Sequence, residues 1–239
     1  MKYENIGKSN LLASRICFGC AGIGGYDYGP VDDDTSIKAI RKAVDLGINF
    51  FDTADVYGFG RSESILNKAL GKHLENCVVA TKFGVKWDKN GTTSKDISPT
   101  HLSRAIEDSL KRLKVETIKL YQIHWPDCST SLEDTIAKLE SLKDDGKLLH
   151  YGACNLSERA FHVCQKHGAL STIQLPFSLL EIENRKLMEE CKTAHKISTM
   201  AYNVLGNGLL SGKYGKDSKF SGTDLRTRVP LFKGKKFVD

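Results

Sequence analysis

The chain has 239 residues, 40% of them hydrophobic and 27% charged, which is enough apolar material for a globular core and excludes an intrinsically disordered chain. The net charge of +6 arises from 35 basic and 29 acidic residues that are mostly interleaved, so we expect neither a nucleic-acid nor a membrane partner. The sequence has no run of eighteen apolar residues and no apolar leader, so we expect neither a transmembrane helix nor a signal peptide. Its seven cysteines are irregularly spaced and do not form a disulfide framework, which favours the reducing cytoplasm.

Seven short apolar runs along the chain are typical of β-strands. They are mostly continuous rather than alternating, as in parallel strands that helices cover. The runs cover residues 15–20, 48–52, 77–81, 118–123, 148–153, 171–175 and 197–202.

The stretches between these runs show the spacing of amphipathic helices. The clearest has apolar residues every three or four positions from Leu102 to Leu113. An earlier one, at 37–46, follows Asp33, Asp34 and Thr35, which supply N-cap candidates and negative charge at a helix start.

Repeated strand–helix units without a linker predict a single α/β domain over residues 1–239. A closed (β/α)₈ barrel needs eight strands, and the Gly-rich and then basic stretch after Tyr202 contains no eighth apolar run. The pattern therefore leaves a barrel that is cut short or an open, doubly wound sheet. The glycines at 19–25 do not have dinucleotide-fold spacing, and three aspartates follow where a pyrophosphate would sit, which argues against the open sheet.

Four polar residues follow the predicted strands at the end where barrel enzymes place their sites: Asp52, Tyr57, Lys82 and His124. Taken singly, each has an ordinary structural interpretation as a cap, a surface lysine, a core histidine or a loop aromatic. Together they indicate chemistry. Asp52 would hold Lys82 charged, and that charge would lower the pKa of Tyr57 from about 10 towards working pH. Tyr57 would then donate a proton to a carbonyl oxygen, which His124 would orient.

Six motifs occur in one order over nearly the whole chain: FDTADVYG, VATKFG, YQIHWPD, YGACNLS, TIQLPFSLL and AYNVLGNGLLSGKY. This set resembles the aldo-keto reductase family, and the LRTRVPLFKGKKF tail is most similar to its bacterial branch of general-stress and inositol-cluster reductases. The resemblance implies a (β/α)₈ barrel that binds NADPH at its C-terminal face and reduces an aldehyde, ketone or sugar carbonyl. The family's catalytic tetrad falls on Asp52, Tyr57, Lys82 and His124.

The same resemblance implies the residues around the cofactor. Asn155 and Gln174 would bind the nicotinamide carboxamide, Tyr202 would stack on the ring, and the loop 203–213 would cover the pyrophosphate. The full set expected at the cofactor is Cys20, Ala21, Asp52, Asn155, Gln174, Tyr202, Asn203, Leu205, Gly206, Gly208, Leu209, Ser211 and Lys213. The alternatives are a flexible connector for the loop and ordinary strand-end capping for Asn155 and Gln174.

Aromatic residues are expected to line the substrate pocket, namely Tyr26, Trp87 and Trp125; the alternative, most of all for Tyr26, is exposure on a mobile loop. Two features depart from the family. Cys154 stands where a serine is usual, and the sequence ends before an eighth strand, so we expect a truncated barrel that lacks its C-terminal unit. Association through the open seam is then possible.

No metal site is expected, because Cys17 and Cys20 lack a second pair at zinc spacing and the histidines are scattered. A second functional interpretation is a cofactor-binding regulatory or redox-sensing subunit of the same fold with little turnover, as in potassium-channel β-subunits. A third is a chain that neither closes its barrel nor binds cofactor.

Overall fold

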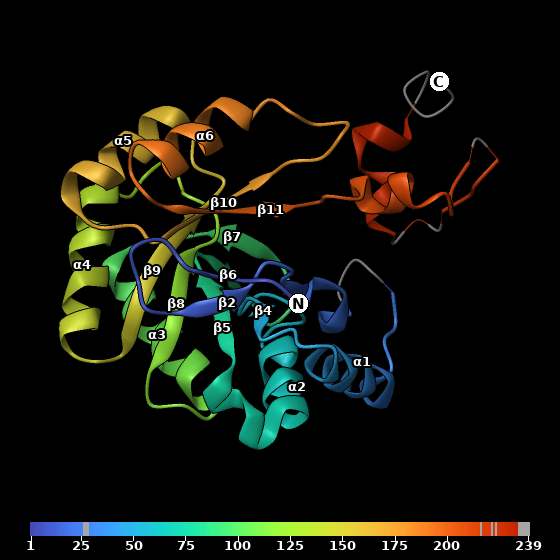
Figure 1. The fold of residues 1–239 in the computed structure, drawn as a ribbon, viewed down its shortest axis with the longest axis horizontal. Helices are drawn as coiled ribbons and strands as arrows, with labels where there is room; N and C mark the ends of the chain where they lie inside the picture. The colour runs from blue at the N-terminus through green and yellow to red at the C-terminus, as the bar shows by residue number, and fades with distance from the viewer. Residues whose placement is uncertain (26–28, 216, 221, 223, 234–239) are drawn as a thin grey trace.

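The computed structural model describes residues 1–25, 29–215, 217–220, 222 and 224–233, and its centre is a curled sheet of seven parallel strands (Figure 1). The strands stand in the order β11-β10-β9-β8-β5-β4-β3. Because this order follows the chain without a reversal, the sheet has the topology of a (β/α) barrel and not of a doubly wound fold. All seven predicted strands are present: β3 (Phe18–Gly19), β4 (Phe50–Asp52), β5 (Val78–Phe83), β8 (Ile118–Ile123), β9 (Leu148–Cys154), β10 (Thr172–Pro176) and β11 (Ser198–Tyr202).

Six α-helices of the described chain wrap around the outer face of the sheet (Figure 1). They are α1 (Asp33–Asp45), α2 (Arg61–Leu70), α3 (Pro99–Leu113), α4 (Leu132–Asp144), α5 (Glu158–His167) and α6 (Arg185–Thr193). Their apolar stripes and the outward side chains of the strands form the main hydrophobic core, in which Phe51, Tyr121 and Phe161 are fully buried.

Helix α1 is capped by the first of the three aspartates at 32–34. The N-cap is Asp32, whose carboxylate accepts a hydrogen bond from the Thr35 N–H at 2.7 Å, and Asp33 and Asp34 lie in the first turn. Asp32 is extended, with φ −80° and ψ 128°, so its carboxylate can reach the first free N–H groups while the helical residues after it cannot.

The inner face of the sheet is filled at its N-terminal end by a hairpin that the sequence patterns did not predict. Strands β1 (Tyr3–Asn5) and β2 (Leu12–Ser14) pair antiparallel, and Ile6 and Ala13 pack against Phe50, Leu120 and Met200. This second, smaller core lies inside the barrel, because Phe50 alternates along β4 with Phe51, which faces the helices. The hairpin therefore closes one end of the barrel and leaves the other end for polar side chains.

Strands β3 and β11 are the two edges of the main sheet, and a long cavity of about 1590 Å³ opens between them. After β11 the described chain forms three short 3₁₀ helices, η3 (Gly206–Ser211), η4 (Leu225–Thr227) and η5 (Pro230–Phe232), which lie beyond the end of the strand at the right of Figure 1. A second hairpin, β6 (Val85–Trp87) with β7 (Thr93–Lys95), follows β5.

Two further observations concern the chain as a whole. Within the described ranges, every helix is too short or too polar to cross a bilayer. All seven cysteines are free thiols, and five of them are buried.

Candidate active site

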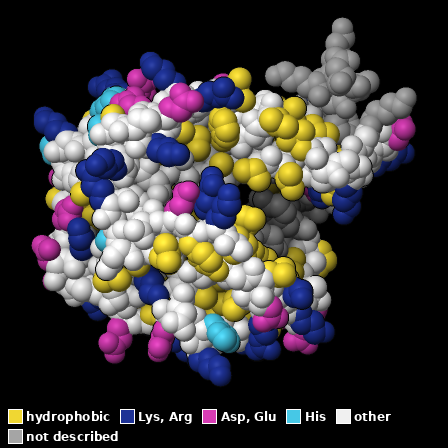
Figure 2. Space-filling model, in the orientation of Figure 1, with side chains coloured by type: hydrophobic (Ala, Val, Ile, Leu, Met, Phe, Trp, Pro, Cys, Tyr) yellow, Lys and Arg dark blue, Asp and Glu magenta, His cyan; other side chains and the backbone are white. Residues whose placement is uncertain are grey.

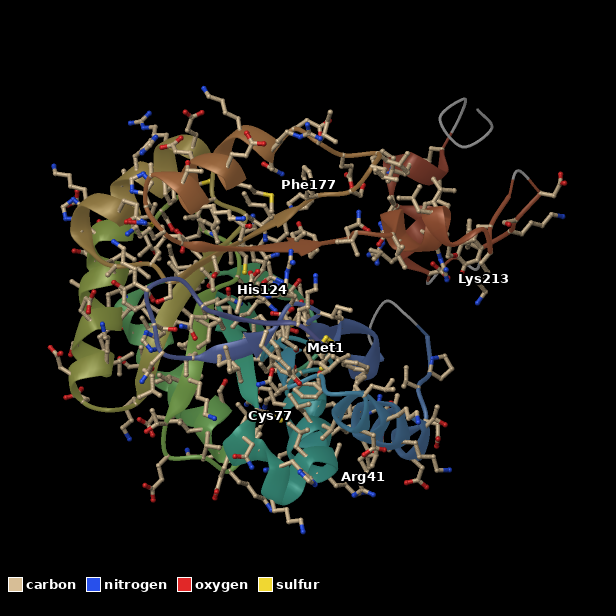
Figure 3. The ribbon with its side chains drawn as sticks, viewed as in Figure 1. Met1, Arg41, Cys77, His124, Phe177 and Lys213 are labelled. Atoms are coloured by element: carbon tan, nitrogen blue, oxygen red, sulfur yellow. The ribbon has the colours of Figure 1, made fainter. Side chains whose placement is uncertain are left out.

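The cavity between the sheet edges carries polar side chains at the C-terminal ends of β4, β5 and β8. Asp52, Lys82 and His124 all line it, together with Tyr57 from the loop after β4. Figure 2 shows this face of the molecule hollowed between its upper and lower halves, and Figure 3 places His124 near the centre, between β11 and the N-terminal hairpin. The structure therefore brings together the four residues that the sequence singled out.

Asp52 and Lys82 form a buried ion pair at the bottom of this site. The Lys82 Nζ lies 2.8 Å from one carboxylate oxygen of Asp52 and 2.9 Å from the other, and it also donates to the Thr53 carbonyl oxygen at 2.7 Å. Asp52 is two residues after Phe50 and Lys82 is two residues after Ala80, so strand alternation turns both side chains to the inner face. The Lys82 side chain is only 2% exposed, which makes the carboxylate its essential counter-ion.

The Tyr57 ring lies over this pair, and His124 packs against that ring. The Lys82 Nζ is 5.0 Å from the centre of the Tyr57 ring, and the rings of Tyr57 and His124 meet edge to face with centres 5.6 Å apart. The loop after β4 can make this approach because Gly58 adopts φ 62°, and a Cβ at that position would lie 2.2 Å from the Gly24 carbonyl oxygen. Glycine at 58 therefore fixes where Tyr57 stands.

The charge states of the four groups follow from burial and from their neighbours. Burial alone would lower the pKa of Lys82, but Asp52 and its hydrogen bond outweigh it and the pKa is raised above its ordinary value. Burial, aided by the Lys82 charge, holds the pKa of His124 well below 6.5, so its imidazole is neutral at physiological pH. Burial also raises the pKa of Tyr57, although Lys82 opposes that rise. The prediction that Lys82 brings the Tyr57 pKa down towards working pH is therefore wrong in its net direction.

A chain of hydrogen bonds extends from Asp52 across the inside of the barrel to strands β9 and β10. The Gln174 amide nitrogen donates to Asp52 Oδ2 at 3.2 Å, and the Cys154 thiol donates to the Gln174 amide oxygen at 3.0 Å. Beside it, Asn155 donates to the His124 carbonyl oxygen at 2.9 Å and accepts from the Tyr202 hydroxyl at 2.8 Å. Cys154, at the position where a serine is usual, is fully buried, and burial raises its pKa, so the thiol stays protonated.

A second buried polar group links α2 to β5 and α3 beside the loop that carries Tyr57, and the sequence analysis did not identify it. Glu63 is fully buried on α2, where it accepts from the Thr81 hydroxyl at 2.5 Å and pairs with Arg112 at 2.5 Å. Burial and the nearby Glu63 charge raise the pKa of Asp55 well above its usual range. In the sequence, Glu63 stands beside Arg61 and Ser62 at the start of a helix, where a charged residue is ordinarily exposed, so nothing in this motif indicated its burial.

The remaining predicted residues divide into those on the cavity wall and those away from it. Ala21, Asn155, Gln174, Tyr202, Asn203 and Trp125 line the cavity, and so do Val204 and Asn207, which the sequence analysis did not single out. The other predicted residues of the loop after β11 lie outside the lining: Leu205, Gly206, Gly208, Leu209, Ser211 and Lys213.

The structure places two of the predicted residues away from the cavity wall, and one lies beyond the described chain. Cys20, which directly follows β3, is fully buried in the core between sheet and helices, because the alternation of side chains along this strand turns it away from the cavity. Trp87 is also outside the lining, since its ring packs on Phe59 with centres 5.6 Å apart. Tyr26 lies outside the described residues.

The site fits a nicotinamide dinucleotide in its donor chemistry. The His124 Nδ1 is buried and has no hydrogen-bond partner among the described atoms. The amide groups of Asn155 and Gln174 each have two N–H donors, and the hydrogen bonds above occupy one on each.

One group of possible metal ligands lies elsewhere, on the outer faces of α5 and α6. Ligand atoms of Glu158, His162 and Glu190 come within 4.8 Å of one another, and His195 Nε2 lies 3.6 Å from Glu190 Oε1. The prediction that the histidines are scattered therefore does not hold at these two positions. None of the four residues lines the cavity.

The sequence and the structure were each compared with known proteins, and the matches agree with one another. A sequence profile of the aldo/keto reductase family matches residues 15–233. The chain is 37% identical to the aldo-keto reductase YhdN of Bacillus subtilis, over 100% of this chain and 72% of that protein. It is 33% identical to an NADH-specific methylglyoxal reductase of Escherichia coli, over 91% of this chain and 71% of that protein. Among solved structures, a glycerol dehydrogenase of Gluconobacter oxydans superposes with a TM-score of 0.90 at 38% identity, over 98% of this chain and 73% of that one.

Proposed function

This chain belongs to the aldo/keto reductase family, and we propose that it is a cytoplasmic, NADPH-dependent reductase of small aldehydes, ketones or sugar carbonyls in which Tyr57 donates the proton. One observation carries the proposal. The Lys82 ammonium lies between the Asp52 carboxylate and the Tyr57 ring, with His124 against that ring, at the C-terminal ends of the strands. The names of two relatives, a methylglyoxal reductase and a glycerol dehydrogenase, support a small carbonyl–alcohol pair as substrate and product.

The protonation states suit reduction. Because burial raises the pKa of Tyr57, its hydroxyl keeps its proton until the carbonyl oxygen gains negative charge. The charged Lys82 then stabilises the tyrosinate that remains, and Asp52 keeps Lys82 charged in a site that would otherwise discharge it. Neutral His124 has one ring N–H to donate to the carbonyl oxygen, which orients the substrate without competing as an acid.

Several residues of this chain would hold the cofactor. Asn155 and Gln174 would bind the carboxamide with their remaining N–H donors, and the Tyr202 ring would pack on the nicotinamide from the end of β11. When bound, a reduced nicotinamide dinucleotide supplies the hydride for the carbonyl carbon. We propose NADPH over NADH because exposed Lys213 and Lys219 follow this strand and suit a 2′-phosphate.

Replacing Tyr57 with phenylalanine tests the proton donor. The variant keeps the ring that packs on Lys82 and His124 but loses the hydroxyl, so we expect turnover with an aldehyde and NADPH to fall at least about 100-fold. Cofactor affinity should stay within about twofold of the unaltered chain. Tyr3→Phe is the matched control, because the Tyr3 hydroxyl only donates to the Gly47 carbonyl oxygen at the exposed hairpin. Full activity of Tyr57→Phe would refute the role.

A fluorescence titration tests the cofactor. Trp125 lines the cavity and is 38% exposed, so a dinucleotide bound there should quench its emission. We expect saturable quenching by NADPH and weaker binding of NADH. Equal affinity for the two would contradict the NADPH preference. Saturable binding without turnover of any carbonyl would instead favour the regulatory or redox-sensing subunit of the same fold.

A further inference from the structure

The hairpin of β6 and β7 places a cation on the wall of the cavity. Lys95, the last residue of β7, pairs with Val85, and both line the cavity. The Lys95 Nζ lies 4.7 Å from the centre of the Trp125 ring, and the rings of Trp125 and His124 stack with centres 6.5 Å apart. Lys95 Nζ is therefore within about 11 Å of the His124 ring, and an aromatic surface connects the two.

The charges around the cavity do not balance. Among the described lining residues are five lysines and arginines but only two carboxylates. Both carboxylates are already paired, Asp52 with Lys82 at 2.8 Å and Glu4 with Arg15 at 3.4 Å. Of the three cations left over, two lie before the start of β11, at the far end of the barrel. Lys95 is thus the cation at the catalytic end that forms no ion pair within the described chain.

The position of Lys95 suits the substrate rather than the cofactor. The loop proposed to cover the cofactor follows β11, whereas the β6–β7 hairpin follows β5, and three strands (β8, β9 and β10) separate β11 from β5 in the sheet. Lys95 and the cofactor loop therefore stand on different sides of the cavity. Trp125 and His124, its neighbours, belong to the side where the carbonyl is proposed to bind.

We propose that Lys95 determines substrate specificity by binding the carboxylate of an anionic aldehyde or ketone whose carbonyl oxygen lies at Tyr57 and His124. The inference rests on the proposed function and extends it to a substrate class, carbonyl compounds that carry a carboxylate. Subtracting a hydrogen bond of about 2.8 Å at each end from a separation of at most about 11 Å leaves about 5 Å between the two substrate oxygens, which is about the span across a meta-substituted benzene ring. The face of Trp125 would pack on that ring.

The test compares two aldehydes of the same shape, 3-carboxybenzaldehyde and the neutral 3-formylbenzamide, with NADPH as reductant. For the unaltered chain we expect a higher kcat/KM with the carboxylate, and an advantage that shrinks as the Debye length falls from about 30 Å at 0.01 M salt to about 3 Å at 1 M. Lys95→Met should lower kcat/KM about three- to tenfold for the carboxylate alone, and Lys95→Arg should retain most of the preference. Lys86→Met is the matched control on the same hairpin, because Lys86 is paired with Asp96 at 3.0 Å.

Each outcome separates the inference from the function on which it rests. A selective loss with the carboxylate in Lys95→Met, with cofactor affinity unchanged, supports the inference. An unchanged ratio of the two kcat/KM values, an equal loss for both aldehydes, or a loss of NADPH affinity would overturn it while the reductase function stands. Absence of any reduction by the unaltered chain would refute the proposed function, and this inference with it.

Discussion

Replacing Asp52 with asparagine should destabilise the protein strongly, although it changes one atom. The side chains of Lys82 and Asp52 are 2% and 11% exposed, so the substitution leaves an ammonium group buried without its counter-ion. Removing one partner of such a pair costs about 3–5 kcal/mol. An asparagine oxygen can still accept from Lys82, so we expect a value near the lower end, about 3 kcal/mol.

The assay is urea unfolding followed by tryptophan fluorescence, with Asp96→Asn as the control. The Lys86–Asp96 pair has similar geometry at 3.0 Å, but its side chains are 46% and 21% exposed, and pairs of this kind contribute about 0.2–1 kcal/mol. The double variant Asp52→Asn with Lys82→Met should be more stable than Asp52→Asn alone, because it removes the uncompensated charge. If Asp52→Asn loses less than about 1 kcal/mol, or if the double variant is the less stable, the argument from burial fails.

Two further predictions concern the site. Gly58→Ala should lower the free energy of unfolding by about 2 kcal/mol or more and displace Tyr57, because its Cβ would lie 2.2 Å from the Gly24 carbonyl oxygen. The control Gly146→Ala has positive φ but open space around the Cβ, and should cost about 1 kcal/mol. Equal losses in urea unfolding would contradict this reasoning. His124 should cause no acid limb near pH 6.5 in kcat/KM, because its folded pKa is well below that value. Below about pH 6.5 the His124 imidazole takes up a proton in the unfolded chain but not in the folded chain, so the free energy of unfolding should decrease as the pH is lowered below 6.5, and less so in His124→Asn. An acid limb in kcat/KM that His124→Asn removes would refute the assignment.

Much of the fold follows from local sequence signals. The seven strands of the barrel were predictable because each coincides with a short apolar run, and the five inner strands are mostly buried. The helices were predictable because their apolar residues recur every three or four positions. The two hairpins were not, since every residue of β1 and β7 is exposed and these strands carry no alternating apolar pattern. Their formation depends on the barrel against which they pack.

The candidate site was predictable where residue type and strand end coincide. Lys82 is the penultimate residue of β5 and His124 directly follows β8, so their convergence follows from the parallel topology. The orientation of Cys20 and Trp87 depends on alternation and on packing against Phe59, which short motifs do not specify. The direction of the Tyr57 pKa shift was also missed, because it is set by how completely the side chain is buried.

The most direct test of the central claim follows one atom. The unaltered chain is incubated with an aldehyde and NADPH that carries deuterium at both C4 positions of the nicotinamide, and the alcohol is analysed by mass spectrometry. We predict deuterium on the carbinol carbon, at a rate that Tyr57→Phe abolishes. An alcohol without deuterium, or no alcohol at all from the unaltered chain, would contradict the assignment of this cavity as a carbonyl-reducing site.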